Sequence, residues 1–181
     1  MNKRPTIAVV LGGALEVWSD LNQILTDLPE EPIMIGTNVS GRDYRGKLHH
    51  WASFHVELFP HWSAQRAEKG LPPADNYWTV QRNRVPVPID VRFIKSWGGS
   101  SGLVGAQVGL EVADRVVLCG VPLTPSLHYD RLDKGPWLEA LKHQAAWSDH
   151  FGELHGRVKS MGGWTQELLG VPSPEWINGE D

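Results

Sequence analysis

The chain has 181 residues, enough for one domain with a sizeable core, and its 41% of hydrophobic residues excludes a disordered protein. Its 17 Lys and Arg against 21 Asp and Glu give a net charge of −4. No basic stretch stands out, so the sequence carries no strong nucleic-acid signature, because binding to phosphate backbones requires dense positive charge. The single cysteine, Cys119, excludes an internal disulfide and a zinc site made of cysteine pairs.

The sequence contains no candidate membrane segment. No apolar run approaches the roughly 18 residues that cross a bilayer, and the first residues lack the long apolar region of a secretory signal. We therefore expect a soluble, cytoplasmic protein without a membrane span.

The first part of the chain predicts the start of a parallel α/β sheet. A continuous apolar run at residues 6–11 ends at two glycines and is typical of a strand buried on both faces. Apolar residues recur at helical spacing over residues 15–28, and a second apolar strand follows at residues 32–37. The middle of the chain then predicts a polar loop, a strand, a helix and two strands, at residues 39–46, 51–56, 60–69, 77–80 and 91–94.

The second half of the chain continues this alternation. It predicts an apolar helix, a buried strand, a long polar loop, a helix, a short strand and a short helix, at residues 103–112, 115–119, 121–135, 136 to about 150, 158–161 and 164–169. Because strands and helices alternate without a linker, we predict a single α/β domain over residues 1–181. Its mostly parallel sheet is sandwiched between helices in three layers.

Several candidate binding residues follow the predicted strands. Ligands of open parallel sheets bind beyond the carboxyl ends of the strands. The residues that this rule selects, with those just before the apolar helix, are Gly12, Gly13, Asn38, Ser100, Ser101 and Gly102. Glycine turns and helix starts offer free N–H groups to an anion. A simple tight turn and a serine cap on the helix explain the same residues.

His128 is the candidate catalytic residue, because it lies in the loop after a buried strand and beside Asp130. A histidine next to a carboxylate can act as a general base. Arg131 and Tyr129 are candidate contacts to a phosphate or substrate. An exposed loop histidine accounts for the same pattern.

The remaining polar and aromatic residues favour structural roles. The middle histidines lack a metal-ligand pattern, so we expect no metal site; these are His49, His50, His55 and His61. His143 is expected on the solvated surface, and Asp43 in a solvated charged loop with Arg42 and Arg45. The 9 tryptophans favour rigid packing. A stacking surface for bases or sugars stays open for some of them, as does a dimer interface, which leaves a homo-oligomer open.

The order of these motifs resembles that of the Rossmann-like bacterial sialyltransferases, which use a CMP-activated sugar, and of related α/β proteins of bacteria and their phages. The shared features are the glycine turn, Thr37-Asn38 after the second strand, Ser101-Gly102 before the apolar helix, and the histidine-bearing loop. The resemblance covers roughly residues 6–130. It implies a Rossmann-like fold, and nucleotide contacts from Gly12, Gly13, Asn38, Ser101 and Gly102, with His128 as the base.

We therefore expect a glycosyltransferase-like enzyme whose substrate is a nucleotide-activated sugar, with His128 as general base and no cofactor. The alternative is a non-catalytic nucleotide-binding or phage-type accessory protein. Two departures from the family favour it: Ala14 stands within its usual glycine–asparagine–glycine–proline–serine turn, and Pro122 stands where it usually has aspartate. A third hypothesis, a pyrophosphate transferase or glycosyl hydrolase, needs a metal-binding pair such as Asp130 with Asp133.

Overall fold

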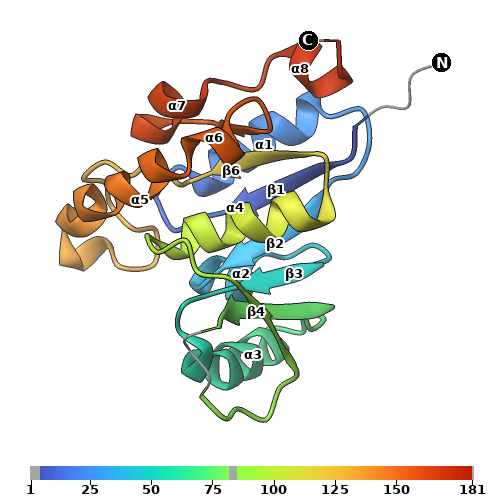
Figure 1. Cartoon of the computed structure of the whole chain (residues 1–181). Helices are drawn as coiled ribbons and strands as arrows, with labels where there is room; N and C mark the ends of the chain where they lie inside the picture. The colour runs from blue at the N-terminus through green and yellow to red at the C-terminus, as the bar shows by residue number, and fades with distance from the viewer. Residues whose placement is uncertain (1–4, 82–84, 181) are drawn as a thin grey trace.

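The computed structural model describes residues 5–81 and 85–180. It contains a seven-stranded sheet in the order β5-β4-β3-β2-β1-β6-β7, in which every pair of neighbouring strands is parallel (Figure 1). The strands are β1 (Ile7–Leu11), β2 (Ile33–Thr37), β3 (His50–Ala52), β4 (Asn76–Val80), β5 (Val91–Ile94), β6 (Arg115–Cys119) and β7 (Val158–Ser160). The predicted fold class, a three-layer Rossmann-like α/β sheet, is confirmed.

Helices cover both faces of this sheet. The α-helices are α1 (Val17–Asp27), α2 (Val39–Asp43), α3 (Phe59–Glu68), α4 (Ser101–Val112), α5 (Gln144–Asp149), α6 (Phe151–Leu154), α7 (Gly163–Leu169) and α8 (Pro174–Asn178). Short 3-10 helices lie at η1 (Val56–Leu58), η2 (Leu132–Lys134) and η3 (Leu138–His143).

The alternation of side chains along the central strands builds two separate cores. Val10 of β1 belongs to the core under α4, which also takes in buried residues of α5, α6 and α7. Val9, its neighbour, belongs to the opposite core under α1 and α8. A third cluster, centred on Trp51, packs α3 onto the outer strands. Figure 1 shows α4 and α1 on opposite sides of the central strands.

Helix α4 packs very closely on the sheet because of its glycines. A side chain at Gly105 would run into Val10 and Thr37, and one at Gly109 would run into Val116. The helix is therefore buried over its first nine residues, from Ser101 to Gly109. This close packing brings its N-terminus next to the ends of β1 and β2.

Three predicted segments fold differently. The strand predicted over residues 51–56 ends at Ala52 as β3, and Val56 begins the 3-10 helix η1. The predicted loop at 39–46 contains helix α2, a single turn that the polar sequence Val-Ser-Gly-Arg-Asp did not indicate. The predicted helix at 136–150 is the 3-10 helix η3 followed by α5. Leu138 and Leu141 of η3 are exposed, whereas Ala140 between them is buried.

The order of the strands reverses around β1. The chain adds β2 to β5 on one side of β1, and then crosses through α4 to place β6 on the other side. Crevices at such a reversal are where open α/β sheets bind ligands. Cys119 is the last residue of β6 and is fully buried. No helix in the described ranges is long and apolar enough to cross a membrane.

Candidate functional site

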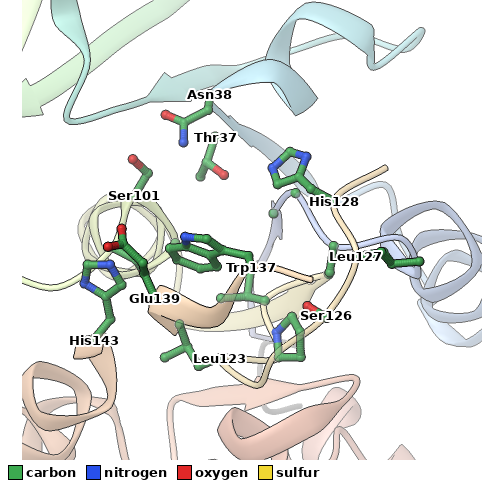
Figure 2. Close-up of a pocket in the computed structure, with 18 of the residues that line it drawn as sticks. Thr37, Asn38, Ser101, Leu123, Ser126, Leu127, His128, Trp137, Glu139 and His143 are labelled. Atoms are coloured by element: carbon green, nitrogen blue, oxygen red, sulfur yellow. The ribbon is translucent and has the colours of Figure 1, made fainter. Parts of the chain in front are cut away.

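A pocket of about 350 Å³ lies at the carboxyl edge of the sheet, where β1, β2 and β6 end (Figure 2). Four segments distant in sequence form much of its wall: the turn after β1, the end of β2, the start of α4 and the loop after β6. The predicted site residues that line it are Gly12, Gly13, Asn38, Ser100, Ser101, Gly102, His128 and Arg131. The strand order thus brings together all the predicted residues except Tyr129.

The turn after β1 is shaped by its contact with β6 and with His128. The N–H of Gly12 donates to the carbonyl of Cys119 at 2.8 Å, and the N–H of Ala14 donates to Gly120 at 3.1 Å. A side chain on Gly12 would overlap Gly120, and one on Gly13 would overlap the imidazole of His128. Glycine is needed at both positions because backbone and imidazole occupy the space of a Cβ.

The loop after β6 is pinned to this turn and carries His128 into the pocket. Ala14 and His128 form an antiparallel bridge, and the N–H of Leu15 donates to the carbonyl of Leu127 at 2.9 Å. Nδ1 of His128 lies 2.6 Å from Oδ1 of Asp130, and both atoms are buried. Because Nδ1 is buried in this contact, Nε2 is the nitrogen that can meet a ligand.

Burial is the largest influence on His128, and it lowers the pKa of the imidazole. The neighbouring carboxylate of Asp130 opposes this shift, while the cations of Arg131 and Arg42 add to it. The net lowering keeps the ring neutral near pH 7, and a neutral imidazole has a free lone pair for accepting a proton.

Asn38 is held in an unusual backbone conformation at the end of β2, with φ of 50°. Its carbonyl accepts a hydrogen bond from Nε1 of Trp51 at 2.8 Å, and its Oδ1 accepts one from the hydroxyl of Ser53 at 2.6 Å. Non-glycine residues with positive φ cluster at functional sites. With Oδ1 occupied, the amide nitrogen is left facing the pocket (Figure 2).

The start of α4 forms the opposite wall. Ser100 stands at the N-cap position, but its side chain makes no capping hydrogen bond, which corrects the expected serine cap. The hydroxyl of Ser101 instead accepts the N–H of Phe54 at 3.3 Å. Gly102 packs against Val121. The first N–H groups of a helix lack intrahelical acceptors, so this wall presents donors and a partial positive charge.

Three pocket residues come from a segment that sequence reasoning did not select. Trp137, Glu139 and His143 line the pocket from the start of η3 onward, and Figure 2 shows Trp137 near the middle of the cavity. The N–H of Trp137 donates to the carbonyl of Ser126 at 2.9 Å. His143, expected on the solvated surface, lies in the pocket wall. The one feature of the sequence that could have indicated His143 as a pocket residue is its position in the segment that follows the candidate loop.

Tyr129 and Arg131 lie on different sides of the loop. Tyr129 points away from the pocket into a second hollow beside Trp18, and its hydroxyl donates to Oδ2 of Asp43 at 2.8 Å. Burial, followed by the charge of Asp43, raises the pKa of this tyrosine. Arg131 lines the pocket with a side chain that is 58% exposed, so it is able to turn toward an anion.

In the described part of the chain, no group of three His, Cys, Asp or Glu side chains is arranged to hold a metal ion. Comparisons with family models, curated proteins and solved structures give no match to this chain.

Proposed function

We propose that the pocket binds a nucleotide-activated sugar and that the protein is a glycosyltransferase with His128 as general base. The observation that carries this proposal is the position of His128 over the glycine turn. Its Nδ1 is buried against a carboxylate, and its Nε2 lies against Gly13 in the wall of a cavity at the reversal of the strand order. Neutral histidine in this setting is suited to removing a proton from a hydroxyl group.

The walls of the pocket suit the two ends of a nucleotide. Backbone N–H groups at Ser101 and Gly102 and the nearby Arg131 offer donors and positive charge to phosphate. Trp137 lines the cavity and is 36% exposed, so part of its ring is available for stacking of a base. The amide nitrogen of Asn38 adds a donor between them. The volume of about 350 Å³ lies within the range of ligand pockets.

The proposed reaction uses these groups in one displacement. Nε2 of His128 accepts the proton of an acceptor hydroxyl, and the acceptor oxygen forms a bond to the anomeric carbon of the sugar. The bond from that carbon to the donor phosphate oxygen breaks, and the electron pair leaves with the phosphate. The helix N–H groups stabilise the charge that develops on the leaving group.

A thermal-shift panel of nucleoside monophosphates and CMP- and UDP-sugars, with and without magnesium, tests the binding step. A ligand at about 100 times its Kd adds roughly 2.7 kcal/mol of stability, which is readily seen as a rise in Tm. We expect Trp137→Ala to abolish the rise. Its matched control is Leu138→Ala, because the neighbouring Leu138 is 69% exposed and outside the pocket wall.

His128→Ala separates binding from chemistry. It should keep the rise in Tm and lose transfer or hydrolysis of the donor that the wild type binds. A flat panel would overturn the nucleotide site. Binding without any turnover in the wild type would overturn the transferase and favour the non-catalytic nucleotide-binding protein.

A further inference from the structure

A row of charged side chains leads from His128 away from the pocket. Oδ1 of Asp130 contacts Nδ1 of His128 at 2.6 Å, and Oδ2 of the same carboxylate lies 3.8 Å from Nη2 of Arg42. Arg42 in turn donates two hydrogen bonds to Asp43, at 2.9 and 2.6 Å. The four side chains are between 16% and 19% exposed. Charges so shielded from water interact more strongly than they would on the surface.

This row joins two elements that are far apart in sequence. Arg42 and Asp43 end helix α2, whereas Asp130 belongs to the loop after β6. A second link runs parallel to the first, because the hydroxyl of Tyr129 donates to Oδ2 of Asp43 at 2.8 Å. Lys69 at the end of α3 also pairs with Asp43. The loop that carries His128 is thus fastened to α2 through Tyr129 and Asp130, the two residues that follow the histidine.

A pair of this kind does more than hold a loop, because a neutral imidazole exists as two tautomers. A carboxylate on Nδ1 selects the tautomer whose proton is on Nδ1, and this leaves the lone pair of Nε2 free. Nδ1 is the nitrogen buried against Asp130, whereas Nε2 lies against Gly13 in the pocket wall. The ring is also stacked on Tyr129, with centroids 5.6 Å apart, so its orientation is fixed from two directions.

We infer that Asp130 is a positioning residue that holds the His128 imidazole with its proton on Nδ1, and that Arg42 of α2 holds the Asp130 carboxylate in turn. This inference rests on the proposed role of His128 as the base. It adds to that role a dependence on α2, the same helix that begins directly after Asn38. Helix α2 therefore has the proposed ligand contact Asn38 at its start and Arg42, which holds Asp130, near its end.

Because the groups that face His128 carry opposite charges, replacing Asp130 and replacing Arg42 should shift the pKa of His128 in opposite directions. Asp130 and Arg131 act from its own loop and Arg42 from α2. The stacked Tyr129 stays neutral because burial raises its pKa, and the turn of Gly13 and Ala14 against the ring is uncharged. Replacing Asp130 removes an attraction for the imidazolium, so the pKa of His128 falls. Replacing Arg42 removes a repulsion, so the pKa rises.

Nitrogen-15 NMR of the histidine rings over pH 4–8, on the ligand-free protein, tests this inference. His128→Gln identifies the signal. We expect the wild type to show the Nδ1-protonated tautomer alone. Asp130→Asn should give a mixture of tautomers and a downward pKa shift, and Arg42→Gln an upward one. Asp133→Asn is the matched control, because Asp133 lies in the same loop with a side chain that is 76% exposed, and it should change neither quantity.

An Nε2-protonated tautomer in the wild type would overturn the inference without any variant. The inference would also be overturned if Asp130→Asn left both the tautomer and the pKa of His128 unchanged, and if Asp130→Ala, which removes the acceptor altogether, gave the same result. Because these measurements use no nucleotide, their failure is distinct from a flat thermal-shift panel. A panel without a shift would remove the proposed function and leave the His128–Asp130 pair in place.

Discussion

The contact between Gly13 and His128 leaves no space for a side chain on the turn after β1. We predict that Gly13→Ala destabilises the protein by about 1–3 kcal/mol, because the new methyl group overlaps the imidazole and the ring or the turn has to move. Urea denaturation measures the change. The displaced ring should also lose its single tautomer.

Gly152→Ala is the control for this substitution. Gly152 lies in helix α6 with no atom within 4 Å of the space that a Cβ would occupy. The change should stabilise the protein by about 0.5–1 kcal/mol, through the helix preference of alanine. Equal effects at both glycines would show that His128 does not occupy the space beside Gly13.

At the scale of residues, the pocket could be predicted from the sequence, whereas the network of charged side chains around Asp43 could not. Gly12, Asn38 and Ser101 were predictable because the ends of parallel strands meet at one edge. Asp43 was interpreted as part of a solvated loop, yet it is partly buried in the structure. Burial raises the pKa of its carboxyl group, but hydrogen bonds from Arg42, Lys69 and Tyr129 outweigh this and lower the pKa to about 2. Such tertiary contacts leave no local pattern in the sequence.

At the scale of elements, Arg66 fastens helix α3 to its surroundings. The side chain is 1% exposed, and its guanidinium donates to the carbonyls of Gly41, Tyr44, Gly46 and Pro72. We predict that Arg66→Met lowers the free energy of unfolding by on the order of 3 kcal/mol, because it leaves buried carbonyl groups without donors. Chemical denaturation measures the loss.

The same helix offers a control. Glu68 is exposed at the end of α3, so Glu68→Met should change stability by less than about 0.5 kcal/mol. If Arg66→Met were equally mild, the guanidinium would not be the fastening between α3 and the segment after α2.

How well an element could be predicted depended on how much of it is buried. Strands β1 and β6 and helix α4 are almost wholly inside, so their apolar runs show both their type and their extent. The short helix α2 is polar and is held by Arg66 and by Asp43, so its own sequence did not show it. The segment of η3 carries Trp137 into the pocket but has exposed leucines, and its apolar spacing imitates an ordinary helix.

At the scale of the whole molecule, buried histidines make stability depend on pH. Burial, followed by the charges of His49 and Arg92, lowers the pKa of His50 from 6.5 to about 4. Nδ1 of His50 accepts the indole N–H of Trp78 at 3.1 Å, which requires an unprotonated nitrogen. The pKa values of His49 and His128 are lowered too, in both cases mainly by burial.

The sign follows from the unfolded chain, which takes up protons below pH 6.5 that the folded protein does not bind until lower pH. The free energy of unfolding should therefore fall as pH drops from about 6.5 to 4, by up to roughly 1.4 kcal/mol per pH unit for each such histidine. The lowered pKa of Asp43 gives a further loss between about pH 3.8 and 2. Urea midpoints between pH 7.5 and 5 measure the first part.

His50→Gln checks the assignment, because the glutamine oxygen can still accept from Trp78 while the titration is removed. The fall in stability between pH 6.5 and 5 should be smaller in this variant. An unchanged pH dependence would mean that His50 is not one of the groups responsible.

The only thiol of the chain lies at the carboxyl end of β6, the strand that pairs with β1 on the far side of the reversal in strand order. Cys119 has no exposed surface, and burial raises the pKa of its thiol well above the ordinary value. Thiol reagents attack the exposed thiolate, so this cysteine reacts only in molecules whose sheet has opened. The rate of its modification therefore measures how often the sheet opens. A ligand bound at the edge of the sheet lowers that rate, because its binding energy stabilises the closed form.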